Sequence, residues 1–114
     1  MVDPLEQPEF KARQQQAESR VLVEILRNIP GHWREVSLEL NGKYSNETGD
    51  RSVSHRLTNL ITGEEIEDFT EGMFLASNLL HALYIRYELE WERCIVSMRL
   101  DDAAEIDWFE VRYL

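Results

Sequence analysis

The hydrophobic residues of this chain switch between two spacings, and that switch is the strongest constraint on its fold. In the second half of the segment from about Pro8 to Ile29 they recur every three or four residues, which predicts a helix that docks through that half. Pro30-Gly31 is a strong helix stop. From Trp33 onward apolar and polar residues alternate, so a strand should follow.

A second strand is expected from Arg51 to Ile61, with Val53, Leu57 and Ile61 on one face. The connection to it has two interpretations. Asn41-Gly42 is typical of a tight turn, whereas the polar stretch from Tyr44 to Asp50 suits a longer loop. The register of this hairpin therefore stays open.

A second helix should begin near Asp68 and form the centre of the core. Asp68 and Glu71 have the spacing of a capping box, in which each side chain satisfies a backbone amide of the first turn. A long apolar stripe follows and predicts the buried face. Its members are Phe69, Met73, Ala76, Leu80, Leu83 and Tyr87, widened by Leu75, Leu79 and Ala82.

Two last strands, Cys94 to Leu100 and Glu105 to Leu114, form a hairpin around a charged turn. The apolar residues change face beside Trp108, which indicates a β-bulge. The order α-β-β-α-β-β predicts an α+β fold: an antiparallel four-stranded sheet with helices packed on one face.

The length of 114 residues fits one core. We therefore expect a single domain over residues 1–114, in which residues 1–19 include a partly exposed helix start. Cys94 is the only cysteine, the first residues lack the basic and apolar segments of a secretory signal, and the apolar runs are too short to span a membrane. These features favour the cytoplasm and no membrane contact.

The charge is strongly negative and unevenly distributed. The net charge is −10, and residues 58–114 carry 13 acidic and 4 basic side chains. Direct nucleic-acid binding is therefore disfavoured. The acidic charge either serves solubility alone or steers the protein toward a basic protein partner.

No local pattern of catalytic residues or metal ligands is present. His32, His55 and His81 lie in three different elements, without the close pairing that metal sites use. Cys94 occupies an apolar strand position, which favours a buried, inert thiol. We therefore predict no catalytic residue, no metal and no cofactor. Trp33 and Trp91 are expected to cover the core, whereas Trp108 lies in an acidic strand and could anchor a partner.

Two segments of the chain resemble a known family. The run from Ile25 to Val36, ILRNIPGHWREV, is similar to the opening of the YezG-type immunity proteins of bacterial polymorphic toxins, a helix followed by Ile-Pro-x-x-Trp-x-x-Val. The run from Trp91 to Met98, WERCIVSM, together with Tyr113, resembles that family's closing hairpin. The turn at Asp101 to Ala104 departs from the family, which has a glycine there, as does the segment Asn41 to Asp50.

The resemblance implies a cytoplasmic protein that binds and blocks its cognate toxin domain, often a nuclease, and catalyses nothing itself. A cationic nuclease surface would meet an acidic inhibitor favourably, so the two lines of reasoning agree. The expected contacts are acidic side chains at the second helix and on the closing hairpin, with one aromatic anchor. They are Glu64, Glu65, Glu67, Asp68, Glu71, Asp101, Asp102, Glu105, Asp107 and Trp108.

The alternative is a specialised secretion chaperone or another acidic adaptor that binds proteins. A chaperone would hold an extended client in apolar grooves and often dimerise, whereas an immunity protein should bind one folded domain at a charge-dependent rate. The sequence leaves open whether this chain forms a homodimer. A small enzyme is the third class, and no local signature favours it.

Overall fold

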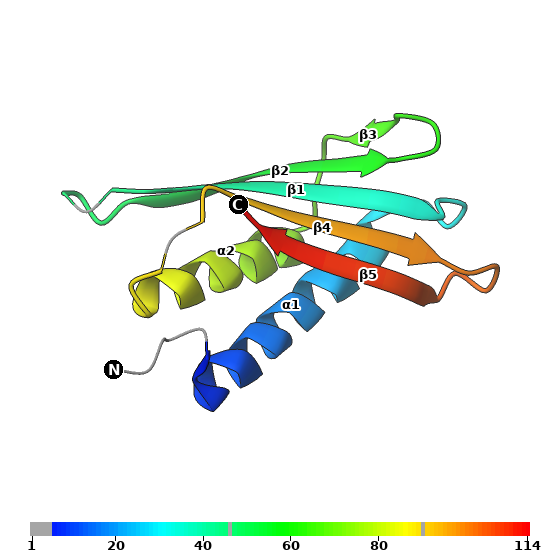
Figure 1. Cartoon of the computed structure of the whole chain (residues 1–114). Coiled ribbons are helices and arrows are strands. Elements are labelled where there is room, and N and C mark those ends of the chain that lie inside the picture. Colours follow the sequence, from blue (N-terminus) through cyan, green and yellow to red (C-terminus); the bar gives the residue numbers. More distant parts are fainter. Residues whose placement is uncertain (1–5, 46, 90) are drawn as a thin grey trace.

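Two helices cover one face of a five-stranded antiparallel sheet (Figure 1). The computed structural model describes residues 6–45, 47–89 and 91–114. The strands lie in the order β3-β2-β1-β4-β5, so the first strand is the centre of the sheet. The elements are α1 (Pro8–Asn28), β1 (Glu35–Tyr44), β2 (Arg51–Asn59), β3 (Glu65–Ile66), α2 (Glu71–Arg86), β4 (Arg93–Leu100) and β5 (Ile106–Tyr113).

The prediction of an α+β fold with helices on one face of an antiparallel sheet is confirmed, but the count of four strands is wrong. The additional strand, β3, contains only Glu65 and Ile66 and pairs with Thr58 and Leu57 of β2. Two residues are too few to show an alternating pattern, so this strand left no signal in the sequence.

Helix α1 begins with Pro8 at its first positions, where a missing amide hydrogen costs nothing. Its second half is buried through Val21, Leu22 and Ile25, as expected. Its first half is anchored by Phe10, which is fully buried and stacks edge-on against the rings of Tyr84 in α2 and of Tyr87, the residue after α2. The first five residues of the expected helix start lie outside the described residues.

The hairpin between β1 and β2 turns later than Asn41-Gly42. Both residues belong to β1, and the turn spans Ser45 to Asp50, where the amide of Ser45 donates to the carbonyl of Asp50. Gly42 serves packing instead. A β-carbon at this position would lie 2.7 Å from Nε2 of His81. At the other end of β2, Ile61 is exposed in the turn rather than buried.

Helix α2 starts at Glu71, three residues after Asp68, and the expected Asp68–Glu71 capping box does not form. The N-cap is Thr70, whose Oγ1 accepts a hydrogen bond from the amide of Met73 at 3.3 Å. Asn28 of α1 holds Thr70 in place, because its side chain accepts from the Thr70 amide and donates to Oγ1. The start of α2 is thus fixed by a residue 42 positions earlier.

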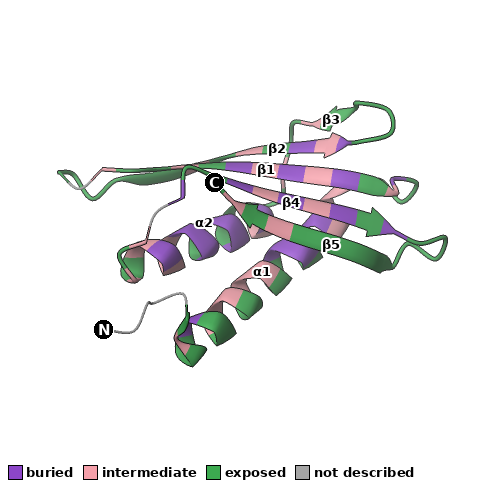
Figure 2. Cartoon of the chain, in the orientation of Figure 1, coloured by how far each residue is buried: buried purple, intermediate pink, exposed green. Residues whose placement is uncertain are grey.

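Only part of the wide stripe on α2 is buried. Met73, Ala76 and Leu80 face the sheet, whereas Leu75 and Leu79 are exposed, contrary to the expectation that they widen the buried face. Two helices and one sheet face leave the outer side of α2 uncovered (Figure 2).

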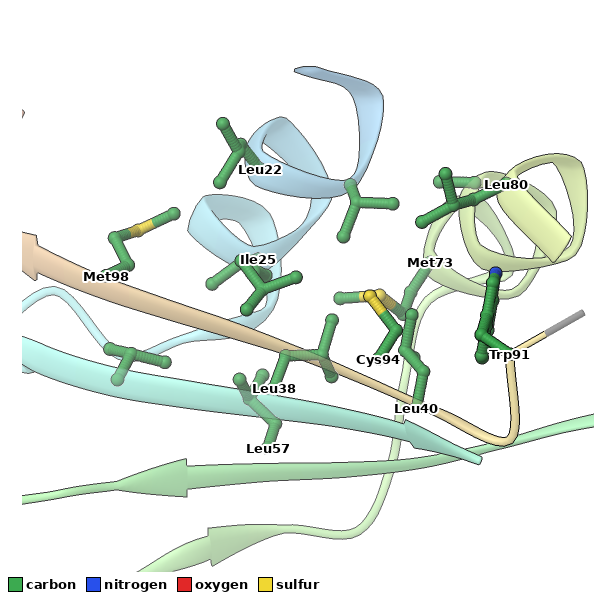
Figure 3. Packing of buried hydrophobic residues seen from close by; sticks show 14 of the residues in the cluster. Leu22, Ile25, Leu38, Leu40, Leu57, Met73, Leu80, Trp91, Cys94 and Met98 are labelled. Carbon is green, nitrogen blue, oxygen red and sulfur yellow. The ribbon is translucent and has the colours of Figure 1, made fainter. Parts of the chain in front are cut away.

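The core lies between the helices and the central strands (Figure 3). Trp33 and Trp91 are 2% and 4% exposed, in agreement with the prediction that they cover the core. Cys94 is buried among Leu40, Met73 and neighbouring residues, and burial raises the pKa of its thiol to about 12. At neutral pH this thiol is therefore protonated and poorly nucleophilic.

Candidate functional site

The turn after β4 and the first part of β5 form the longest run of exposed residues in the described part of the chain. All ten residues from Asp101 to Glu110 are exposed, and β5 forms one edge of the sheet (Figure 2). Three of the ten are large and apolar: Ile106, Trp108 and Phe109 are 36%, 45% and 48% exposed. Aromatic side chains are enriched at protein-binding surfaces, where a few of them supply much of the affinity.

The turn of this hairpin is held by Asp101. One oxygen of its carboxylate accepts hydrogen bonds from the amides of Ala103 and Glu105, at 2.9 and 3.0 Å. Ala104 closes the turn in the left-handed region, at a φ of 61°. Asp101 therefore shapes the turn, whereas Asp102 and Glu105 have no cationic partner within 4 Å among the described residues.

A bulge at Asp107 sets the direction of the aromatic side chains. Arg99 pairs with Trp108 and Leu100 with Ile106, so Asp107 is the extra residue on β5. The bulge lies beside Trp108, where the sequence predicted it. Trp108 consequently shares the outer face of the sheet with Arg99, and Asp107 bonds Arg99 at 3.3 Å.

Phe109 lies on the opposite face from Trp108, because it pairs with Met98, which is buried under the helices. It stays half exposed at the sheet edge. The edge strand therefore offers an aromatic ring on each face. Phe109 is a candidate contact that the charge pattern does not indicate, although its position directly after Trp108 in a strand already requires the two rings to point in opposite directions.

The far end of β5 is fastened to both helices. The hydroxyl of Tyr113 donates to Oε2 of Glu18 at 2.6 Å, and its ring lies 4.7 Å from the ring of Tyr84. Gln14 donates to the Tyr84 hydroxyl at 2.6 Å. Burial raises the pKa of Glu18, and the hydrogen bond from Tyr113 offsets part of that rise. These contacts give the exposed part of β5 a rigid base.

The remaining acidic candidates form a second cluster at the opposite edge of the sheet. They follow β2, occupy β3 and lead into α2; they are Glu64, Glu65, Glu67, Asp68 and Glu71. Four strand spacings separate the two edges, or about 19 Å. Glu65 is already paired with Arg56, so its charge is largely compensated.

Part of this second cluster nevertheless lies at the same end of the sheet as the acidic turn. Leu60 and Leu100 donate to the carbonyls of Glu35 and Arg34, so the turns after β2 and after β4 flank the start of β1. The structure therefore places Glu64 and Asp102 at the same end of the sheet, but toward opposite edges of it. The predicted contacts do not form one continuous acidic face.

The outer face of the sheet is charge-balanced rather than acidic. Each of its strands pairs an arginine with a carboxylate across or along the strand. The pairs are Arg56–Glu65, Arg93–Glu39, Arg99–Asp107 and Arg112–Glu110. Such exposed pairs contribute little stability, but they cancel the local field. Asp102 and Glu105, in the turn after β4, belong to none of these pairs.

His55 and His81 pack against aromatic rings, whereas His32 is exposed in the turn after α1. Nε2 of His55 lies 2.5 Å from Oγ of Ser77, which is buried and donates its own proton to the carbonyl of Phe74. His81 packs against Trp91, and burial lowers the pKa of both imidazoles. In the described part of the chain, no three His, Cys, Asp or Glu residues gather as metal ligands.

Comparisons with known proteins give no family assignment. No protein-family model matches the chain, and a comparison with curated proteins finds no significant match. Over residues 6–45, 47–89 and 91–114, no helix is both long and apolar enough to cross a membrane.

Proposed function

We propose that this protein is an immunity protein: it binds a cognate, basic bacterial toxin domain, such as a nuclease, in the cytoplasm and blocks it one to one without catalysing a reaction. The observation that carries this proposal is the β4–β5 hairpin, which combines ten consecutive exposed residues, uncompensated carboxylates and two exposed aromatic rings on a firmly held strand.

In this mechanism the two kinds of side chain have separate tasks. Asp102 and Glu105 attract lysines and arginines of the toxin over several ångströms and so raise the association rate. Trp108 then enters a pocket of the toxin and slows dissociation. The free edge of β5 offers unpaired backbone groups beside the same ring, which can hydrogen-bond the partner. Occupation of the phosphate-binding surface would exclude the nucleic acid.

Co-expression tests the proposal directly. The candidate toxin is the compact, basic C-terminal domain of a protein encoded beside the gene for this chain. We expect this domain to stop growth when expressed alone, to permit growth when the chain is co-expressed, and to co-purify with it as a 1:1 complex. A growth-arresting domain that neither binds the chain nor is neutralised by it would contradict the proposal.

Trp108→Ala separates binding from folding. We expect the dissociation rate to rise about 30-fold, corresponding to about 2 kcal/mol, because the ring is the proposed anchor. The free energy of unfolding should change by less than about 0.5 kcal/mol, because the ring is half exposed. Tyr44→Ala is the matched control, since Tyr44 is a similarly exposed aromatic at the far end of β1. Equal dissociation rates for the two variants would remove Trp108 from the interface.

A further inference from the structure

The outer sides of α1 and α2 form an apolar groove that faces solvent. Val23 of α1 and Leu75 and Leu79 of α2 line it and are 46%, 59% and 49% exposed. Val23, Leu75 and Leu79 line a hollow of about 400 Å³ in this groove. A second hollow of similar volume continues the groove along the two helices. The two hollows share Leu79 and Arg20, so they form one surface.

Arginines border this groove in a molecule whose net charge is −10. Four of the chain's 12 basic residues lie along it: Arg13, Arg20, Arg27 and Arg86. Arg13 and Arg27 are paired with Glu9 and Glu24. Within the described residues, Arg20 and Arg86 have no carboxylate within 4 Å, and Glu24 is the one acidic residue that lines either hollow. The groove is therefore locally cationic.

The shape of the groove fits a helix. α1 and α2 run antiparallel, since Asn28 contacts Thr70 at one end and Gln14 contacts Tyr84 at the other. From Arg13 to Arg27 each helix turn adds 5.4 Å, so the groove is about 21 Å long and matches about 14 helical residues. The small residues Ala17, Ala76 and Ala82 lie along it and leave room between the two helix axes.

We propose that this groove binds an amphipathic helix of a partner protein whose polar side is rich in Asp and Glu. The apolar side of that helix packs on Val23, Leu75 and Leu79, and its carboxylates meet Arg20 and Arg86. A second copy of this chain fits less well, because a symmetric contact would bring two arginine borders together. This surface lies on the helix side of the sheet and is independent of the β4–β5 hairpin.

A designed peptide tests the proposal without knowledge of the natural partner. The probe is a fluorescein-labelled 15-residue helix with Leu at every third or fourth position and Glu elsewhere, measured by fluorescence anisotropy. Two control peptides carry Lys in place of Glu, or the same composition with the apolar positions scrambled. We expect the full protein to bind the acidic amphipathic peptide at least about 10-fold more tightly than either control.

Variants assign the binding to the groove. The double substitution Arg20→Glu with Arg86→Glu should weaken binding by at least about 10-fold. The double substitution Lys11→Glu with Lys43→Glu changes the net charge by the same amount at exposed positions away from the groove and should change binding less than about 2-fold. Leu79→Asp should abolish binding, whereas Leu60→Asp, in an exposed turn, should not. Circular dichroism checks that each variant stays folded.

Several results would overturn the proposal. They are equal binding of the acidic and basic peptides, equal effects of the two double variants, or no binding of the acidic peptide at millimolar concentration. Two further outcomes would assign the groove to another occupant. One is dimerisation in sedimentation analysis that Leu79→Asp abolishes; the other is binding to phosphatidylserine vesicles, with none to the peptide, that depends on Arg20 and Arg86.

Discussion

Gly42 shows how a single residue can be fixed by a distant contact. It lies near the end of β1, and a β-carbon there would lie 2.7 Å from Nε2 of His81 and 3.1 Å from Cζ3 of Trp91. Both rings are buried and packed on each other, so neither can move away freely. We expect Gly42→Ala to lower the free energy of unfolding by about 1–3 kcal/mol, measured by urea denaturation.

Two further variants test this explanation. Gly31→Ala should change stability by less than about 0.5 kcal/mol, because no atom lies within 4 Å of the added methyl group. In the background of His81→Ala, the cost of Gly42→Ala should fall, since the obstructing ring is gone. An unchanged cost in that background would show that the clash is not with His81.

The same residue marks a limit of inference from sequence. Asn41-Gly42 has the local chemistry of a tight turn, and that chemistry is genuine. The decisive contact is between Gly42 and His81, a helix residue 39 positions later. A two-residue pattern contains no information about such a distant contact. Trp33, Trp91 and Cys94 could be assigned to the core because their own apolar surface decides their location wherever the chain places them.

Glu18 should make stability depend on pH. Burial raises the pKa of its carboxyl above the ordinary value of 4.5, so the folded state favours the protonated form. Its favourable contribution is thus present below pH 4.5 and is lost as the pH rises through the folded pKa. We expect Glu18→Gln to be more stable than the natural protein at pH 7, with the difference shrinking at pH 4, in urea denaturation at both pH values.

Glu92→Gln serves as the control, because it removes the same charge at an exposed position. It should not reproduce the pH-dependent difference. A Glu18→Gln variant that is less stable than the natural protein at pH 7 would instead show that the bond from Tyr113 to the carboxylate outweighs the burial.

At the scale of elements, the start of α2 gives a test of which residue caps the helix. Thr70→Ala removes the acceptor for the Met73 amide and also the partner of the Asn28 side chain. We expect a loss of about 1–2 kcal/mol in the free energy of unfolding. Asp68→Ala should cost less than about 0.5 kcal/mol, because Asp68 is exposed and precedes the cap. The reverse ranking would restore Asp68 as the cap.

Most elements could be predicted from the sequence because their apolar periodicity is long enough to be unambiguous. α1, α2, β1 and β4 each bury several residues at regular spacing. The bulge in β5 was also predictable, since only an extra residue moves the apolar side chains from one face to the other. The cap of α2 was not, because Asp68 and Thr70 are both good caps and Asn28, far away in the chain, decides between them.

At the scale of the molecule, the placement of the unpaired carboxylates predicts how association responds to salt. Reversing the charge of the hairpin, Asp102→Lys with Glu105→Lys, should slow association with a basic partner by about 10-fold at low salt and have little effect at high salt. Stopped-flow mixing measures both rates. Glu47→Lys with Asp50→Lys makes the same charge change at the opposite end of the sheet and should have a smaller effect.

A variant in which Glu64, Glu67 and Asp68 are all changed to Lys tests whether the second cluster also steers the partner. Its association rate is measured at low and high salt in the same way. Slower association with this variant would extend the interface across the end of the sheet. Equal rates for the hairpin variant and for its control would exclude the hairpin carboxylates from steering.

The arrangement of the candidate site could be predicted only in part. The acidic residues were identifiable by composition, but their separation onto two sheet edges follows from the strand order, in which β1 lies at the centre. Similarly, the apolar residues of α2 gave no sign of which side would dock, since Leu75 and Leu79 are as hydrophobic as Leu80. Which side of α2 is buried depends on how many layers of the fold pack against the helix, and not on the sequence of the helix alone.

The bond between Glu18 and Tyr113 joins residues 95 positions apart, and β1 receives its second neighbour, β4, only late in the chain. During translation, the apolar side of β1 and the inner face of α1 therefore remain partly uncovered until the residues around Tyr113 have left the ribosome, because β4 and β5 are still missing from the sheet. A nascent chain paused before Arg93 would keep these surfaces open to chaperones and proteases. Cellular yield should then depend on how quickly the codons for residues 93–114 are translated.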